Sequence, residues 1–268
     1  MKKIIAVHDL SGIGTASLGA VIPVLTAMGS YVCPLQTAAL STVTGVFEGY
    51  TFKDLTKYIN DTIKHWQQLN MEFDYIYSGF LGSPSQAQTI IEARNMFGCK
   101  LMVDPVFGDD GHLYPTMTSE MVESMKNLVS NADIITPNIT EAMFLLGEKD
   151  IPSNFETIEK WLVRLCDIGP DTAIITSCKV DGEMYVCCYS KSTGEFYKIK
   201  CCYYDGSFHG TGDIFASVTL GAIARGQDIK DAVGLAVDFV SKAIEETIKE
   251  KSDPRLGVAM QKVIKELL

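Results

Sequence analysis

A carboxylate follows two glycines in the segment Gly210-Thr211-Gly212-Asp213, and a long apolar run comes next. The run predicts a helix, whose first backbone N–H groups have no partners and can bind an anion. Because glycine has no Cβ, phosphate oxygens can approach such a loop closely. Asp213 could then accept a proton from an attacking hydroxyl while the loop amides hold the developing charge. The alternative is an acid that only stabilises the helix dipole.

Further acids follow two other predicted strands. Asp104 and Asp109 lie just beyond a short apolar run, and Glu141 closes the segment Thr136–Glu141. Acids at neighbouring strand ends can hold Mg²⁺ beside substrate phosphates, directly or through water. The alternatives are a solvated acidic turn for the first pair and capping of the next helix, by Thr140 with Glu141, for the second group.

The segment His8–Gly14 partly fits a dinucleotide-binding fingerprint, but its third glycine is missing because position 17 is Ser. A substrate-contacting loop fits better, with Asp9 and Ser11 offering hydrogen bonds, and an ordinary turn is the alternative. The polar turn Ser41–Gly45 indicates only a loop by itself. A P-loop enzyme and a protein kinase are excluded, since neither set of motifs occurs.

Short apolar runs alternate with helical patterns along most of the chain. Strands are expected at Ile4–Val7, Tyr31–Ala39, Tyr75–Ser78, Leu101–Val103, Ile134–Thr136 and Ala173–Thr176, and helices at Ala16–Met28, Lys53–Leu69, Ser83–Met96, Glu120–Val129, Thr140–Leu146 and Ile158–Cys166. This order predicts an α/β fold, a three-layer sandwich with a mostly parallel central sheet flanked by helices. An antiparallel hairpin, Met184–Tyr189 with Phe196–Tyr203, is added to it. We expect a single domain over residues 1–268.

The formal net charge of -10 disfavours nucleic acid and anionic membranes as partners. No apolar run is long enough for a membrane span, and Ile4–Val7 is too short for a signal peptide, so we expect a cytoplasmic protein. The 8 cysteines include no Cys-x-x-Cys pair, which favours reduced thiols over a zinc site.

Taken together, the motifs resemble the ribokinase-like superfamily and, within it, the pyridoxal/pyridoxamine kinases. The resemblance covers nearly the whole chain and is carried by Tyr77–Ser83, Asp104–Asp109, Thr136–Glu141 and Gly210–Asp213. It implies an ATP-dependent kinase that phosphorylates the 5′-hydroxymethyl group of pyridoxal, pyridoxamine or pyridoxine. It also implies Mg²⁺, in some members K⁺, and a homodimer.

The resemblance further implies roles for individual residues. Asp213 would be the catalytic base, with the amides of Gly210, Thr211 and Gly212 as the anion hole. The substrate would contact Asp9, Ser11, Thr44, Phe80 and Asp213; ATP would contact Asp104, Asp109, Thr136, Asn138, Glu141, Thr176, Ser177, Thr211 and Gly212; and Mg²⁺ would be positioned by Asp109, Thr136 and Glu141.

Some positions depart from the pattern of pyridoxal kinases. Many of them have Gln-Ser-His in place of His8-Asp9-Leu10, often Ser-Asn-His-Thr-Gly in place of Ser41–Gly45, and commonly Tyr in place of Phe80. The Asp-x-Ser-Gly run also resembles hydroxymethylpyrimidine kinases of thiamin synthesis, which commonly have Cys in place of Asp213. The vitamer therefore stays open. The alternative functions are a hydroxymethylpyrimidine kinase and a non-catalytic vitamin- or nucleotide-binding protein.

Overall fold

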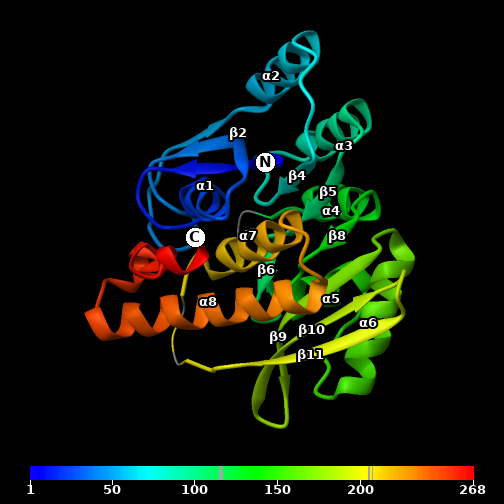
Figure 1. Cartoon of the computed structure of the whole chain (residues 1–268), viewed down its shortest axis with the longest axis vertical. Coiled ribbons are helices and arrows are strands. Elements are labelled where there is room, and N and C mark those ends of the chain that lie inside the picture. Colours follow the sequence, from blue (N-terminus) through cyan, green and yellow to red (C-terminus); the bar gives the residue numbers. More distant parts are fainter. Residues whose placement is uncertain (115–116, 205, 207) are drawn as a thin grey trace.

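The computed structural model describes residues 1–114, 117–204, 206 and 208–268. At its centre is a nine-stranded sheet in the order β11-β10-β9-β8-β5-β4-β1-β2-β3 (Figure 1). The strands are β1 (Lys3–Ser11), β2 (Tyr31–Leu40), β3 (Phe52–Asp54), β4 (Tyr75–Ser78), β5 (Lys100–Val103), β8 (Ile134–Ile135), β9 (Thr172–Val180), β10 (Glu183–Ser190) and β11 (Glu195–Cys201). The pairs from β9 through to β2 are all parallel, whereas β3 and β10 run against their neighbours.

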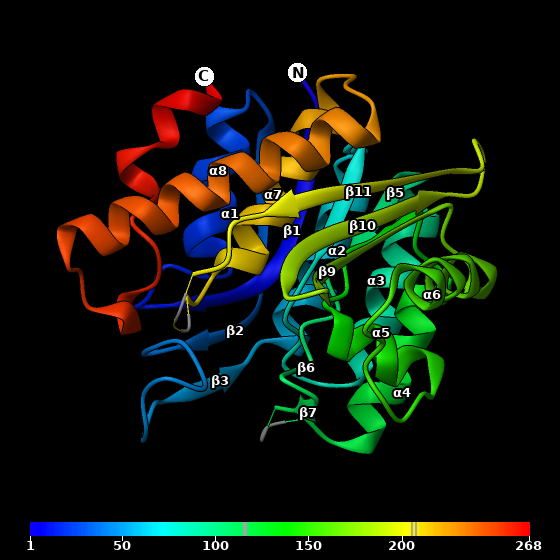
Figure 2. The same ribbon diagram turned by 90° about the horizontal axis from the view of Figure 1, so that it is seen from below.

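Helices cover both faces of this sheet (Figure 2). One face carries α1 (Leu18–Ala27), α7 (Thr211–Ala224) and α8 (Ile229–Glu250), and the other carries α2 (Thr56–Gln68), α3 (Ser85–Phe97), α4 (Ser119–Ser130), α5 (Ile139–Leu146) and α6 (Phe155–Ile168). The chain ends in three short 3-10 helices, Pro254–Leu256, Met260–Lys262 and Ile264–Leu267. The predicted three-layer α/β fold is confirmed. Within the described ranges, no helix is both long and apolar enough to cross a membrane.

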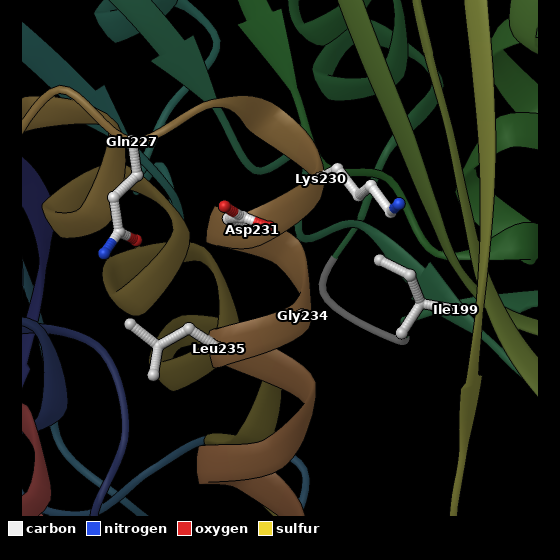
Figure 3. Close-up of a pocket in the computed structure, with 6 residues that line it drawn as sticks. All are labelled: Ile199, Gln227, Lys230, Asp231, Gly234 and Leu235. Atoms are coloured by element: carbon white, nitrogen blue, oxygen red, sulfur yellow. The ribbon is translucent and has the colours of Figure 1, made fainter.

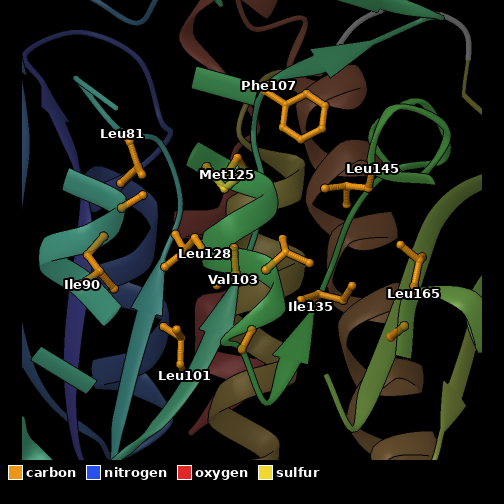
Figure 4. Close-up of a cluster of buried hydrophobic side chains, with 14 of the residues drawn as sticks. Leu81, Ile90, Leu101, Val103, Phe107, Met125, Leu128, Ile135, Leu145 and Leu165 are labelled. Atoms are coloured by element: carbon orange, nitrogen blue, oxygen red, sulfur yellow. The ribbon is translucent and has the colours of Figure 1, made fainter. Parts of the chain in front are cut away.

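The inner strands β4 and β8 are buried along their whole length because helices cover both faces of the sheet there. In β1, Ile5 and Val7 join the core under α2 to α6, whereas Ile4 and Ala6 join the core under α1, α7 and α8. Figure 4 shows part of the first core, where Leu101, Val103 and Ile135 of the sheet lie among leucines from the covering helices. This pattern is the usual one for strands covered on both sides.

Several predicted boundaries were wrong, among them the end of β1, which continues past Val7 to Ser11, and the predicted hairpin was right. The expected helix Lys53–Leu69 loses its first residues to β3, which pairs with the end of β2, and α2 begins at Thr56. Asp54 Oδ1 accepts a hydrogen bond from Thr56 N (2.9 Å), which fixes that change of direction. Strand β9 continues past Thr176 to Val180, because this extension pairs with β10. The hairpin β10–β11 forms as expected.

Helices α1 and α7 pack side by side and are tied to each other at both ends. At their N-termini, Ser17 N donates to Asp213 Oδ2 (2.8 Å). At their C-termini, Arg225 Nε donates to Met28 O (2.7 Å), where a cation suits the exposed carbonyls of a helix end. Gly221 permits the close approach between them, since a Cβ there would lie 2.4 Å from the Met28 sulfur. This packing fixes where the start of α7 lies relative to β1.

We expect Gly221→Ala to destabilise the fold by about 1–3 kcal/mol, because the added methyl group overlaps Met28 and separates the two helices. Gly234 of α8 provides the control, since a Cβ there meets nothing within 4 Å and alanine favours helix. Urea unfolding followed by circular dichroism gives both free energies of unfolding. If the two variants were equally stable, the close packing of α1 on α7 would not be supported.

Candidate active site

The carboxyl ends of β1, β4, β5 and β8 form one edge of the sheet, and most of the predicted site residues lie along it. Three backbone hydrogen bonds continue the strand pairing by one residue: Gly79 N to Val7 O (3.0 Å), Asp104 N to Ser78 O (2.8 Å) and Thr136 N to Val103 O (3.0 Å). In the sheet, β2 and β3 lie on one side of β1, and β4, β5, β8 and β9 lie on the other. The edge between β1 and β4 is thus the switch point, where open α/β sheets bind ligands.

Asp213 reaches this switch point from the first turn of α7. Its Oδ2 accepts the hydrogen bond from Ser17 N, and its Oδ1 lies 3.6 Å from Nδ1 of His8. His8 is fully buried and packs edge-on against Tyr77, with 4.4 Å between ring centroids. The first amides of α7 have no intrahelical partners, and they open onto the same edge. The predicted base and the predicted anion hole are therefore brought together.

The glycine loop before Asp213 has the geometry that its sequence indicates. Gly210 has φ of 80°, and a Cβ there would lie 2.0 Å from Thr15 O, so only glycine fits. The Thr211 hydroxyl donates to Phe208 O (2.9 Å), which closes the loop on itself. Gly212 is exposed. The loop can therefore offer backbone amides to an anion without a side chain covering them.

Asp9 is buried at the end of β1 and is held by two hydroxyl groups. Its Oδ2 accepts from Ser11 Oγ (2.9 Å) and its Oδ1 from Ser17 Oγ (2.5 Å). Burial raises the pKa of Asp9, the hydrogen bond from Ser17 opposes that rise, and the charge of Asp213 adds to it. Asp9 and Ser11 therefore lie in β1 and not on a loop, which corrects the expected loop, and their role in binding a substrate stays a prediction.

Thr44 and Phe80, the other predicted substrate contacts, lie on loops beside this end of β1. Val43 N donates to Ile13 O (3.0 Å), which holds the loop of Thr44 against the loop that follows β1. Phe80 follows β4, and its carbonyl accepts from Thr37 Oγ1 of β2 (2.8 Å). Both side chains are half-buried, so both stay accessible at the edge of the sheet.

Asp104 and Glu141 form a buried acidic pair beyond β5 and β8. Burial raises the pKa of Asp104 well above its usual range, and the charges of Glu141 and Asp213 raise it further. Burial also raises the pKa of Glu141 to about 7, against the opposing effect of backbone N–H donors. No ion pair among the described residues gives either acid a Lys or Arg partner. A Cβ on Gly212 would lie 3.7 Å from Asp104 Oδ2, so the pair adjoins the glycine loop.

The cap of α5 is Asn138 and not Thr140, which corrects the alternative considered from the sequence. Asn138 Oδ1 accepts from Glu141 N and Glu141 Oε2 accepts from Asn138 N, both at 2.9 Å, which is a capping box. Glu141 Oε1 also accepts from Phe107 N (2.9 Å). Thr140 is already helical, and its hydroxyl instead accepts from Gly111 N (2.9 Å). Glu141 therefore has a structural role whatever else it binds.

A short hairpin, β6 (Gly108–Asp109) with β7 (His112–Leu113), lies over the start of α5 and was not predicted. Its turn residues Asp110 and Gly111 have φ of 48° and 78°, as in a type I′ turn. The dipeptide Asp-Gly is itself a strong hairpin signal. Asn138 Nδ2 donates to Gly108 O (2.8 Å) and anchors the hairpin. Asp109 is consequently carried, exposed, beside the acidic pair.

The remaining predicted ATP contacts lie at the ends of β8 and within β9. Thr136 is buried, and its hydroxyl has no partner among the described residues. Thr176 N donates to Pro137 O (3.0 Å), and Thr176 forms a bridge with Asn138. Ser177 is exposed with φ of 59°, next to an irregularity in the β9–β10 pairing. Thr136, Asn138 and Thr176 are thus neighbours, and Ser177 lies at the outer side of them.

His8 and Ser17 contact Asp213 directly, yet neither was predicted as a site residue. His8 carries a weak signal, because a buried histidine inside an apolar strand needs a polar neighbour. Ser17 precedes a helix and therefore has the pattern of an ordinary N-cap. The structure shows that its side chain makes no capping hydrogen bond.

An open groove between β11 and the start of α8 lies away from this site (Figure 3). It is lined by Ile199, Gln227, Lys230, Asp231, Gly234 and Leu235. Gln227 follows the C-terminus of α7, and the 14 residues of that helix span about 21 Å from the end that carries Asp213. None of the predicted site residues lines the groove.

Comparison with known proteins matches residues 14–255 to the family described as phosphomethylpyrimidine kinase. A provisionally assigned phosphomethylpyrimidine kinase from Bacteroides thetaiotaomicron, solved with pyridoxal, is 40% identical, with a TM-score of 0.95 over 99% of this chain and 95% of that one. The pyridoxal kinase from Lactobacillus plantarum is 30% identical, with a TM-score of 0.93 over 100% and 97% of the two chains.

A provisionally assigned pyridoxine kinase from Staphylococcus aureus is 33% identical over 181 residues. The matched region covers 64% of this chain and 63% of that protein, so it spans slightly less than two thirds of the relative. The structural matches, which cover nearly the whole of both chains, confirm the ribokinase-like α/β fold that the motifs predicted.

We expect Asp104→Asn to stabilise the ligand-free protein at about pH 8, by roughly 1 kcal/mol or more. The pKa of Asp104 is higher in the folded protein than in the unfolded chain. The free energy of unfolding of the wild type therefore falls as the pH rises from the unfolded-state pKa through the folded-state pKa. Asparagine does not ionise and removes this loss. Urea unfolding in metal-free buffer at several pH values should show that the difference in free energy of unfolding between the variant and the wild type increases with pH. A difference independent of pH would contradict the assignment of Asp104 as a destabilised buried acid.

Proposed function

The chain belongs to the phosphomethylpyrimidine kinase family, and on that premise we propose that it transfers the γ-phosphoryl group of ATP to the 5′-hydroxymethyl group of pyridoxal, pyridoxamine or pyridoxine. The observation that carries this proposal is Asp213 at the switch point, among the free amides of α7 and next to buried acids. The pyridoxal bound by the Bacteroides thetaiotaomicron protein and the name of the Lactobacillus plantarum enzyme support the substrate class.

In the proposed reaction, Asp213 accepts the proton of the substrate hydroxyl as its oxygen attacks the γ-phosphorus in line. The bond from that phosphorus to the bridging oxygen breaks, and ADP leaves with the electron pair. The amides of Gly210, Thr211 and Gly212 stabilise the charge that develops on the transferred group. The backbone N–H of Ser17 holds Asp213 in place throughout.

The residues present fit Mg²⁺, although among the described residues no three His, Cys, Asp or Glu side chains converge on a metal site. Mg²⁺ in phosphoryl-transfer sites is held by one or two carboxylates together with water and substrate phosphates. Glu141, exposed Asp109 and the unpartnered hydroxyl of Thr136 are suitable oxygen donors. When bound, the ion would neutralise charge on the triphosphate.

The two substrates would occupy opposite sides of Asp213. Asp9, Ser11, Thr44 and Phe80 lie toward β1 and would hold the pyridine ring, with Phe80 stacked on it. The ATP side would be formed by Asp104, Asp109, Thr136, Asn138, Glu141, Thr176, Ser177, Thr211 and Gly212. The homodimer and the dependence on K⁺ stay predictions from the family resemblance, and the cytoplasmic location and the single domain stay predictions from the sequence pattern.

A second candidate is a hydroxymethylpyrimidine kinase, which the description of the matched family favours. The acid at position 213 favours the first candidate, since hydroxymethylpyrimidine kinases commonly have Cys there. With ATP and Mg²⁺, we expect purified protein to phosphorylate at least one of pyridoxal, pyridoxamine and pyridoxine faster than hydroxymethylpyrimidine. Coupled detection of ADP with chromatography of the phosphorylated product measures all four rates. Turnover of hydroxymethylpyrimidine alone would replace the first candidate by the second.

Asp213→Asn should lower kcat by roughly 10²–10⁴-fold while leaving ATP affinity largely intact, because the amide cannot accept the proton. Asp231→Asn is the matched control, since Asp231 is the acid in the first turn of α8 and lies in the remote groove. The control should retain turnover. Equal activity of both variants would show that Asp213 serves only the helix dipole.

A further inference from the structure

Ser17 hydrogen-bonds to two acids of the proposed site, Asp213 and Asp9. Its backbone N–H donates to Asp213 Oδ2 (2.8 Å), and its hydroxyl donates to Asp9 Oδ1 (2.5 Å). Asp213 and Ser17 are separated by 196 positions in the sequence, so this contact joins the start of α7 to the start of α1. A single residue therefore fixes the distance between the proposed base and the proposed substrate-contacting acid.

The backbone of Ser17 is held against its own preference. Its φ of 49° and ψ of -137° lie outside the regions that residues other than glycine usually adopt. Its hydroxyl makes no capping bond to α1, although serine normally uses its hydroxyl that way at this position. Its carbonyl still accepts from Ala20 N and Val21 N, both at 2.9 Å, so α1 begins here with the side chain turned to Asp9. Such strain in a buried residue persists only where the surroundings impose it.

We propose that Ser17 is a positioning residue for the reaction, in which the hydroxyl bond to Asp9 holds the strained peptide so that its N–H stays directed at the base Asp213. The proposal rests on the proposed function for the identity of Asp213 as the base. Ser17 itself need not touch either substrate. Loss of the hydroxyl would free the peptide to relax, and the orientation of the Asp213 carboxylate would relax with it.

Charged and titratable groups from several elements surround Asp9 and Asp213. The charge of Asp213 in α7 and that of His8 in β1 act on Asp9, while Tyr77 of β4 and Asp104, which follows β5, lie near Asp213. The hydroxyl of Ser17 lowers the pKa of Asp9, which burial raises. Removal of that hydroxyl should therefore move the protonation of Asp9 to higher pH.

Two substitutions separate positioning from a structural role at the start of α1. Ser17→Ala removes the hydroxyl and leaves a side chain that disfavours positive φ, whereas Ser17→Gly removes the hydroxyl and adopts positive φ freely. Ser30→Ala is the control, because Ser30 is also buried and lies beyond the opposite end of α1. If Ser17 only starts the helix, Ser17→Gly should be as active as the wild type.

Steady-state kinetics against pH, with ATP and the best vitamer, provide the first test. We expect both Ser17 variants to lose about tenfold or more in kcat, with KM for ATP within about twofold and the acidic limb of kcat moved to higher pH. Ser30→Ala should match the wild type. The proposal would be overturned if Ser17→Gly had the kcat of the wild type and the same acidic limb. Ser17→Gly also keeps the test possible if Ser17→Ala does not fold.

A second measurement does not depend on turnover. Carboxyl ¹³C NMR of aspartate-labelled protein, with the Asp9 resonance assigned through Asp9→Asn, follows the titration of Asp9 directly. In Ser17→Gly this resonance should titrate at higher pH than in the wild type. An unshifted titration of Asp9 would contradict the positioning role of Ser17. A wild-type protein that phosphorylates no vitamer would instead contradict the proposed function. The two failures are thereby distinguished.

Discussion

The structure depends on keeping several carboxylates close together in a partly buried edge of the sheet, where no Lys or Arg of the described residues forms an ion pair with them. Asp9, Asp104 and Glu141 are all buried, and each has a pKa raised first by that burial. Burial of an unpaired charge is costly in any protein. What offsets the cost for Asp9 and Glu141 is mainly backbone N–H groups and hydroxyls, and most of these donors come from the start of a helix or from a loop.

The helices are arranged so that they supply those donors. Glu141 receives N–H groups from the cap of α5 and from Phe107, and Asp213 receives one from the start of α1. The helix dipole adds to the effect, because the positive ends of α1, α5 and α7 all point to this edge. The packing of α1 against α7, held at the far end by Arg225, therefore has a direct electrostatic consequence at the near end.

Much of this arrangement follows from local sequence, and the parts that do not follow involve distant partners. The buried strand Tyr75–Ser78 and the loop Gly210–Asp213 are recognisable because each is specified by its own residues. The role of Ser17 depends on an acid 196 positions away, and its positive φ is imposed by the assembled site, so no local pattern reveals it. The edge strand β3 was missed for a similar reason, since its pairing with β2 keeps Lys53 and Asp54 out of the helix that was expected to begin at Lys53.

The same constraint explains why the acids at this edge are not interchangeable. Asp104 has burial and two neighbouring charges against its ionised form, and no hydrogen-bond donor among the described residues offsets them. Asp213 is less buried, and it receives the Ser17 N–H at the positive end of α7. Environments that treat two nearby carboxylates so differently are how one site assigns one acid to proton transfer and keeps the other from it. The division of labour in the proposed kinase thus follows from which acid lies at a helix start and which lies at a strand end.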